Sequence, residues 1–367
     1  MQHSRTRHAD ARIGFVVPLA ATLVLAALQP LIAATIHVQA KSPGDAAAKI
    51  QQAVDFAKDG DDVVLEKGTY ILSAEIVISK PITLRGAKDQ NATVLDGNHS
   101  NRCLRLAHSG AVLEDLTITH GSGAQGGGGG GIYCAAGTIR NCVITENDSG
   151  DSSGGGILVH GSLAIQNSTI AGNKSCVGGG IEVRGSLDMD TCIVSGNVAR
   201  VDAGGLECGS NTVIRNSVFA DNIAGRNGAG IDTSYRSSLS VVNTTLRGNK
   251  ATSSVASHGG SLHITGTASA NLQTCVITRN SSGCKGGGVF NADRLNLVGC
   301  TIENNTAGTE GGGIFNYRTR SVRAENCRIA GNSAAKGSDM HGELTSAGST
   351  QIGSAAECTI VVEAAKQ

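Results

Sequence analysis

Four side chains that can exchange protons recur at similar intervals in the middle of the chain: Glu182, Glu207, Asp232 and His263. Carboxylates that are held close together repel one another, which raises the pKa of one of them and lets it serve as a general acid. Two carboxyls at a suitable separation hydrolyse a glycosidic bond, and the separation decides between retention and inversion. Acid–base cleavage of a polysaccharide is therefore one chemistry open to these residues, provided that the fold brings them together.

The elements that hold these residues belong to an internal repeat. An apolar residue followed three positions later by asparagine recurs at regular intervals in eight successive segments, at Ile144/Asn147, Ile170/Asn173, Val194/Asn197, Phe219/Asn222, Leu246/Asn249, Ile277/Asn280, Ile302/Asn305 and Ile329/Asn332. Successive asparagines are 26, 24, 25, 27, 31, 25 and 27 residues apart. A second mark, a run of small residues that ends in an apolar residue, falls at Ile132, Ile157, Ile181, Leu206, Ile231, Leu262, Val289 and Ile314. Two independent marks with one period indicate repeated structural units.

Each repeat unit has the pattern of short strands. Its segments alternate apolar with polar residues and are separated by turns of Gly, Asn and Ser. Three short strands and three turns use roughly 25 residues and return the chain above its starting point, where each coil pairs in parallel with the next at about 4.8 Å. The sequence therefore predicts a parallel solenoid of about ten coils, in which glycine permits the tight turns.

The repeat also predicts which side chains face outward. Because side chains alternate along a strand, Glu182 points outward if Ile181 and Val183 point into the solenoid. The same position in the other coils gives an outward series, the ladder column, made of Tyr133, Leu158, Glu182, Glu207, Asp232, His263, Phe290, Phe315 and His341. We expect an exposed face on which three acids in adjacent coils are flanked by aromatic rings, with Tyr317 beside them.

Carbohydrate binding without cleavage is the first function that this face suggests. Aromatic rings stack on the faces of sugars, and carboxylates accept hydrogen bonds from hydroxyl groups. The predicted substrate-binding residues are Tyr133, Arg184, Arg236, Phe290, Phe315 and Tyr317.

A polysaccharide lyase or glycoside hydrolase is the alternative from a different class. A lyase would use Arg184 or Arg236 to neutralise a uronate beside His263 as the base. The catalytic residues of this alternative are Glu182, Glu207, Asp232 and His263. A simpler interpretation is also open, because exposed strand positions are often acidic and Glu182 with Arg184 could form an ordinary solvated ion pair.

Metal and cofactor binding have little support in the sequence. The eleven cysteines show no Cys-x-x-Cys spacing of the kind that indicates zinc. Ca²⁺ held among Glu182, Glu207 and Asp232 is an alternative, because hard oxygen ligands gather there. Otherwise no cofactor or metal is expected.

Most of the cysteines fall in register with the repeat. Five positions before each repeat asparagine stands a small residue, at Cys142, Ser168, Cys192, Ser217, Thr244, Cys275, Cys300 and Cys327. Thiols in such a column behave as small apolar residues of the core. We therefore expect few disulfides or none.

The N-terminal segment has the pattern of an export signal. Three arginines precede an apolar run over residues 13–34 that ends in small residues, which predicts a bacterial-type signal cleaved near its end. Retention of this run as a membrane anchor is the alternative, because a run of this length can cross a bilayer. After it, Asp45 is placed to cap a helix over residues 46–58, and this helix would cover the open end of the solenoid.

Two stretches resemble known families. IQQAVDFAKDGDDVVLEKGTYILSAEIVISKPITLRG, over residues 50–86, resembles the N-terminal cap and first coils of the pectin-lyase-like right-handed parallel β-helix superfamily. The pairing of GGGI with Ile-x-x-Asn is similar to the repeats of polymorphic outer-membrane proteins, although only Phe219 has the Phe-x-x-Asn form usual there. The resemblance covers about residues 35–345 and implies a right-handed parallel β-helix. The Asn-Thr-Asp, Gly-His-Gly and Arg-Ile-Lys motifs of polygalacturonases are missing, so no activity of the superfamily is carried over by motif.

These observations give one prediction for the whole chain: an all-β, right-handed parallel β-helix with a short N-terminal capping helix. The predicted parts are a signal peptide over residues 1–34, the cap and first coils over 35–100, the repeats over 101–345 and a C-terminal cap or tail over 346–367. The expected protein is a monomer that is secreted, periplasmic or on the surface of a bacterium, without stable membrane insertion once the signal is cleaved. Its expected partner is a polysaccharide or cell-surface glycan, with a rigid scaffold or adhesin as a further alternative. Thirty basic and thirty acidic residues form no polycationic face, which argues against nucleic acid.

Overall fold

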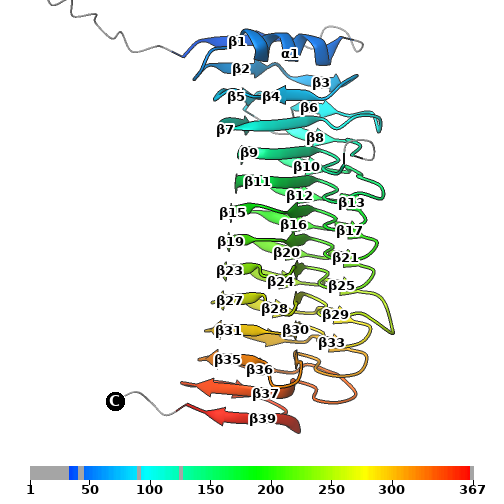
Figure 1. Cartoon of the computed structure of the whole chain (residues 1–367), viewed down its shortest axis with the longest axis vertical. Coiled ribbons are helices and arrows are strands. Elements are labelled where there is room, and N and C mark those ends of the chain that lie inside the picture. The colour runs from blue at the N-terminus through cyan, green and yellow to red at the C-terminus, as the bar shows by residue number, and fades with distance from the viewer. Residues whose placement is uncertain (1–32, 40–44, 89–91, 124–126, 364–367) are drawn as a thin grey trace, which may run out of the picture. The chain divides into compact units, whose positions relative to one another are not determined.

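The computed structural model describes residues 33–39, 45–88, 92–123 and 127–363, which belong to the compact unit Ala33–Gln367. Residues 1–32 lie outside the described residues, so the signal peptide stays a prediction. Within this unit the strands stack coil upon coil in chain order (Figure 1). In the described ranges, no helix is long and apolar enough to cross a membrane.

Three parallel sheets build the solenoid. The first contains β1 (Thr35–Val38), β2 (Asp62–Leu65), β4 (Ile76–Ile78), β5 (Thr83–Arg85), β7 (Leu104–Glu114), β9 (Ile132–Arg140), β11 (Ile157–Gln166), β14 (Ile181–Val183), β15 (Ser186–Asp190), β18 (Leu206–Cys208), β19 (Asn211–Arg215), β22 (Ile231–Thr233), β23 (Ser238–Val242), β26 (Leu262–Ile264), β27 (Ser269–Gln273), β30 (Val289–Asn291), β31 (Arg294–Val298), β34 (Ile314–Asn316), β35 (Ser321–Glu325), β37 (Met340–Ala347) and β39 (Glu357–Val362). The second contains β3 (Gly68–Ile71), β6 (Thr93–Asp96), β8 (Thr117–Thr119), β10 (Val143–Thr145), β12 (Thr169–Ala171), β16 (Ile193–Ser195), β20 (Val218–Ala220), β24 (Thr245–Arg247), β28 (Val276–Thr278), β32 (Thr301–Glu303), β36 (Arg328–Ala330) and β38 (Gln351–Ile352). The third contains β13 (Lys174–Ser175), β17 (Val198–Ala199), β21 (Ile223–Ala224), β25 (Lys250–Ala251), β29 (Ser281–Ser282) and β33 (Thr306–Ala307).

The described residues form twelve coils, because each coil contributes one strand to the twelve-stranded second sheet. The prediction of about ten was too low. Eight coils place the asparagine of the apolar-x-x-Asn mark in the buried ladder. The coils of β3, β8 and β38 have no asparagine at this position, and in the coil of β6 the equivalent Asn98 is exposed. Period counting therefore finds the central repeats and underestimates the two ends of the stack.

The repeat asparagines form a buried ladder along the solenoid. In the middle of it, the backbone N–H and side-chain amide of Asn197 both donate to Oδ1 of Asn222, at 3.0 Å each. Asn222 repeats both bonds to Asn249, at 3.1 and 2.9 Å. The last asparagine, Asn332, donates in the same way to Oδ1 of Asp339, at 2.8 and 2.9 Å. The asparagine mark thus satisfies the polar groups of a buried turn in every coil that carries it.

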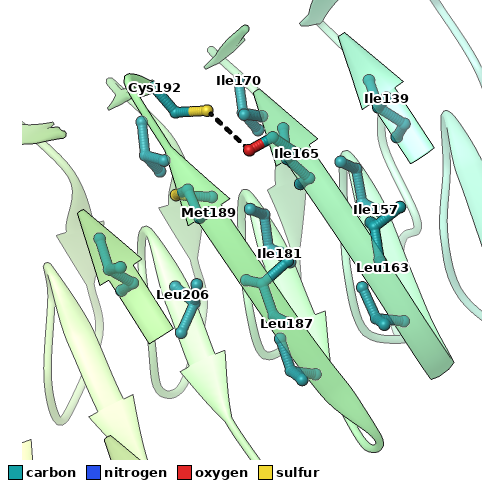
Figure 2. Packing of buried hydrophobic residues seen from close by; sticks show 14 of the residues in the cluster. Ile139, Ile157, Leu163, Ile165, Ile170, Ile181, Leu187, Met189, Cys192 and Leu206 are labelled. Atoms are coloured by element: carbon teal, nitrogen blue, oxygen red, sulfur yellow. Dashed lines mark hydrogen bonds between the residues drawn. The ribbon is translucent and has the colours of Figure 1, made fainter. Parts of the chain in front are cut away.

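The core is a stack of aliphatic side chains with thiols at its margin. Figure 2 shows the inward residues Ile157 and Ile181 lying side by side on neighbouring strands, as the register Ile157–Ile181 requires. In the same view Cys192 donates its thiol to the carbonyl of Ile165, at 3.7 Å. All eleven cysteines are free, and the five in the predicted column are buried. The inward column was therefore predicted correctly.

A short helix covers the N-terminal end of the stack. Helix α1 (Ala46–Phe56) buries Ile50 and Val54 against the first coils. Its amino end differs from the prediction, because Asp45 makes no capping bond with its side chain and instead pairs with Lys49 at 2.8 Å. The helix also ends two residues earlier than expected, where Lys80 Nζ donates to the terminal carbonyls of α1.

Candidate functional site

The strand pairings place the ladder column in the predicted register. Leu158 pairs with both Tyr133 and Glu182, and each later member pairs with the next. The remaining pairs are Glu182–Glu207, Glu207–Asp232, Asp232–His263, His263–Phe290, Phe290–Phe315 and Phe315–His341. The structure thus brings all four predicted catalytic residues into consecutive coils of one sheet.

The ladder column is much less exposed than the sequence predicted. Only 5% of Asp232, 9% of His263, 6% of Phe290 and 4% of Phe315 is accessible to solvent. The cover comes from the turn before each strand. A Cβ added to Gly228, for example, would lie 2.6 Å from Cβ of Asp232, so the turn backbone already rests against the ladder side chain. Strand alternation places a side chain outside the sheet, but it does not reveal a second layer of chain above it.

That second layer is regular. The residue five positions before each ladder residue from Leu158 onward belongs to it, and we call this series the covering row: Ser153, Val177, Asp202, Asn227, His258, Lys285, Glu310 and Lys336. Within the covering row, the backbones of residues in neighbouring coils pair in parallel: Asn227 with His258, His258 with Lys285, and Lys285 with Glu310. The ladder column and the covering row together form the polar layer outside the first sheet.

Two glutamates in adjacent coils each keep one carboxylate oxygen without a partner. Oε1 of Glu182 accepts a hydrogen bond from Arg184 Nε at 2.9 Å, and Oε1 of Glu207 accepts one from the Ser234 hydroxyl. Oε2 of both glutamates is buried and lacks a hydrogen bond from any described residue. Burial, reinforced by the charge of Asp232, raises the pKa of Glu207 well above its ordinary value. Glu207 therefore retains a proton at pH values where an exposed glutamate is ionised.

Asp232 and His263 form a buried acid–imidazole pair. Oδ1 of Asp232 lies 2.6 Å from Nδ1 of His263. Burial raises the pKa of Asp232, while the contact with His263 opposes that rise. A carboxylate bound to one imidazole nitrogen fixes the ring and its tautomer, as in catalytic acid–base pairs.

A second imidazole, that of His258, lies beside this pair and was missed by the sequence prediction. Its ring centroid lies 6.0 Å from that of His263 and 4.4 Å from that of Phe290. Burial lowers the pKa of His258 to about 4, with further contributions from His263, Lys285 and Arg226. His258 lies in the longest interval between repeat asparagines, from Asn249 to Asn280. The extra length was the available signal, and it brings this imidazole to the ladder.

The aromatic part of the ladder packs on itself. The rings of Phe290 and Phe315 are stacked with centroids 5.1 Å apart, and Phe315 stacks on His341 at the same distance. Lys285 Nζ lies 4.5 Å from the Phe315 centroid and 2.7 Å from Glu310. Both phenylalanines are therefore covered, and the prediction of Phe290 and Phe315 as exposed rings was wrong.

At the other end of the ladder, Tyr133 is enclosed by two arginines. Arg102 and Arg105 lie over its ring at 5.3 and 4.8 Å from the centroid. Both arginines also pair with Glu75, at 2.7 and 3.2 Å. With two guanidinium groups over its ring and His160 stacked 6.1 Å away, Tyr133 has little room to stack on a ligand.

Exposed aromatic rings lie instead on the turns that follow the ladder strands. Tyr235 is 63% exposed and carries the Arg236 guanidinium 5.1 Å from its centroid. Tyr317 is 37% exposed and carries Arg318 at 4.9 Å. We call Tyr235–Arg236 and Tyr317–Arg318 the Tyr–Arg turns. Tyr235 and Arg318 were not predicted, because only a repeated fold shows that these two turns occupy equivalent places.

The Tyr–Arg turns lie on one edge of the solenoid. They precede β23 and β35, which are connected through β27 and β31 in one continuous register. Three coils separate them, or about 14 Å at the spacing of parallel strands. Neither Arg236 nor Arg318 forms an ion pair with a carboxylate of the described residues, and both are exposed.

A groove of about 430 Å³ lies on the same sheet toward the N-terminal coils. Its lining mixes small polar residues with aliphatic ones: Ser109, Gly137, Thr138, Ser162, Leu163, Ala164, Ser186, Leu187, Asp188, Asn211 and Val213. Arg184 precedes β15, the strand that carries Ser186 and Asp188 into this groove. In the described part of the chain, no three His, Cys, Asp or Glu side chains are arranged to hold a metal ion.

Two protein families match parts of the sequence. Residues 84–251 match the right handed beta helix region, and residues 299–317 match the repeat of the Chlamydia polymorphic membrane protein. Both matches confirm the resemblance inferred from the repeat marks. No curated protein sequence matches the chain.

Solved structures with a similar fold have low sequence identity. An alginate lyase from Paenibacillus sp. str. FPU-7 is 16% identical, with a TM-score of 0.46 over 84% of this chain and 97% of that one. The pectate lyase Pel9A is 12% identical, with a TM-score of 0.43 over 90% and 78% of the two chains. PfbA, a surface adhesin of Streptococcus pneumoniae, is 12% identical, with a TM-score of 0.41 over 86% and 87%. At these identities no residue role is transferred to this chain.

Proposed function

We propose that this chain is an exported β-helix protein that binds an acidic polysaccharide or cell-surface glycan along the edge marked by the Tyr–Arg turns. The observation that carries the proposal is the pair of exposed tyrosines, Tyr235 and Tyr317, each with a guanidinium over its ring. An exposed ring offers a flat apolar face for a sugar, and arginine offers a planar donor pair for a carboxylate or sulfate. Holding the arginine against the ring fixes part of its conformation before the ligand arrives.

The spacing of the turns favours a polymer over a single sugar. Sites about 14 Å apart on one edge can be occupied by one chain, and the second contact then forms at a high effective concentration. The groove that contains Ser162, Ser186 and Asp188 continues along the same sheet and supplies hydroxyl and carboxylate partners for sugar hydroxyls. This path replaces the buried ladder rings as the proposed contact surface, and it keeps Arg184, Arg236 and Tyr317 from the sequence prediction.

Titration calorimetry tests the proposal directly. The full chain is titrated with polygalacturonate and alginate as acidic polymers and with dextran as a neutral one. We expect binding to the acidic polymers, and Tyr235→Ala or Tyr317→Ala should each weaken it about tenfold, the upper part of the range for an aromatic contact.

Two matched variants control for the loss of an exposed ring or charge. Phe56 is an exposed aromatic residue of α1, and Arg247 is an exposed arginine of the second sheet. Phe56→Ala and Arg247→Gln should leave the affinity unchanged. Equal losses in the controls and in the Tyr–Arg variants would refute a specific edge.

Acid–base cleavage of the bound polymer is a second candidate function. Its support is the protonated Glu207 one coil from the buried Asp232–His263 pair, a combination of a proton donor and an oriented imidazole. Reducing ends would reveal hydrolysis, and ultraviolet absorbance of an unsaturated product would reveal a lyase. Glu207→Gln and His263→Ala should abolish either product while the calorimetric affinity remains. Turnover that survives both substitutions would exclude this cluster as the catalytic site.

A further inference from the structure

Three of the buried cysteines occupy consecutive coils, and we call them the thiol stack: Cys275, Cys300 and Cys327. Each precedes a strand of the second sheet, and the residues that follow them pair in register as Val276–Thr301 and Thr301–Arg328. The backbone keeps the same register at the cysteines themselves. Thr301 N–H donates to the Cys275 carbonyl, and Arg328 N–H donates to the Cys300 carbonyl, both at 2.9 Å.

The sulfur atoms of the thiol stack contact the neighbouring coil. The N–H of Cys300 donates to Sγ of Cys327 at 3.4 Å. Interaction with the thiol of Cys300 lowers the pKa of Cys275, and interaction with Cys275 raises the pKa of Cys300 to about 11. Adjacent parallel strands lie about 4.8 Å apart, which falls within the Cα separation of disulfides, roughly 4.4–6.8 Å.

A thiol is not needed at this position for hydrogen bonding. In the coils before the thiol stack, the hydroxyls of Ser168, Ser217 and Thr244 accept the same backbone N–H from the preceding coil. Cys142 and Cys192 occupy the column too, but each has a serine neighbour instead of a cysteine. The thiol stack is therefore the part of this column where one cysteine lies directly above another.

We propose that Cys300 forms a disulfide bond with Cys275 or Cys327 when the protein folds in an oxidising compartment. The two thiols lose their protons, their sulfur atoms form the S–S bond, and the two electrons pass to a small-molecule disulfide, which is reduced to two thiols. Cys300 is required for either pairing because it is the central member of the stack. The bond would join two coils within the uniform part of the solenoid.

Burial determines when this bond can form and break. All three thiols are at most 2% exposed, and a buried thiol reacts slowly with external reagents. The bond therefore forms while the coils are still opening and closing, and it resists reduction in the folded protein. The proposal does not depend on carbohydrate binding, because the thiol stack belongs to the second sheet and the Tyr–Arg turns belong to the first.

Thiol counting after denaturation tests the proposal. The full chain is refolded in a mixture of reduced and oxidised glutathione, denatured without reductant, and titrated with a thiol reagent. Of the eleven cysteines, nine should react, because two are held in the bond. Trypsin places Cys275, Cys300 and Cys327 on different peptides, since Arg279, Arg294, Arg318 and Arg323 lie between them. Mass spectrometry should therefore find the Cys300 peptide linked to one of the other two.

Serine variants identify the cysteines that form this bond. Cys300→Ser should restore full reactivity of the remaining ten thiols, and the double variant Cys275→Ser/Cys327→Ser should restore full reactivity of its remaining nine. Cys192→Ser, a matched control in the same column, should still lack two reactive thiols. Eleven reactive thiols in the parent chain, or a missing pair that persists in Cys300→Ser, would overturn the proposal.

Discussion

Substitution of one ladder asparagine tests how the repeat mark stabilises the solenoid. Asn222→Ala removes the acceptor Oδ1, which binds the backbone N–H of Asn197 at 3.0 Å and its side-chain amide at 3.0 Å. It also removes the donor that Asn222 offers to the carbonyl of Val194 at 2.9 Å. Asn222 is fully buried, so water does not replace these partners.

The expected cost follows from the groups that lose a partner. A buried donor left without an acceptor costs about 1–3 kcal/mol, and two donors of Asn197 are affected. The free energy of unfolding should therefore fall by about 2–6 kcal/mol, which places Asn222→Ala among the more damaging single substitutions.

Urea-induced unfolding followed by circular dichroism measures this loss. Asn271→Ala is the matched control, because Asn271 is an exposed asparagine of β27, where a change within about 0.5 kcal/mol is expected. If Asn222→Ala and Asn271→Ala shift the urea midpoint equally, the asparagine ladder does not stabilise the coils and the reasoning is refuted.

Three further substitutions address the polar layer outside the first sheet. Burial raises the pKa of Glu207 above 4.5, so the folded state loses stability as pH rises past that value. Glu207→Gln should remove this loss. If the pH profile of thermal unfolding stays the same in the variant, Glu207 is not the group that titrates. Burial lowers the pKa of His258 from 6.5 to about 4, so the stability of the fold should decrease as pH drops between these values. His258→Gln should reduce that decrease. If the stability of the variant depends on pH as strongly as that of the parent chain, another group titrates. Ala203 has a φ of 62° at the place that Gly228 fills in the next coil, so Ala203→Gly should stabilise the protein by about 0.5–1 kcal/mol, net of the added entropy of the unfolded chain. Calorimetric unfolding would detect that gain, and a loss of stability would show that the methyl group packs favourably.

The fold was largely predictable because its geometry repeats. Once the interval between successive asparagines is known, in-register parallel pairing follows, and the pairing of Glu182, Glu207, Asp232 and His263 follows with it. The inward position of the cysteine column was predictable for the same reason. The number of coils was not, because the first three coils and the last contribute no asparagine to the buried ladder.

The candidate site was less predictable than the fold. Alternation along β30 and β34 correctly places Phe290 and Phe315 outside the sheet, but their burial depends on the covering row, whose residues come from irregular turns. His258 could have been suspected only from the length of its turn. Tyr235 lies in a turn that looks ordinary until the pairing of the coils shows that it shares an edge with Tyr317.

The affinity of the double variant Tyr235→Ala/Tyr317→Ala for an acidic polysaccharide is the most direct test of carbohydrate binding along the Tyr–Arg edge. Calorimetry should show that the parent chain binds polygalacturonate or alginate, and that the double variant loses more affinity than either single variant. Its thermal unfolding midpoint should stay unchanged, because both rings are exposed. Binding of equal strength in the parent chain and the double variant would contradict the account, as would a well-folded parent chain that binds no acidic polysaccharide.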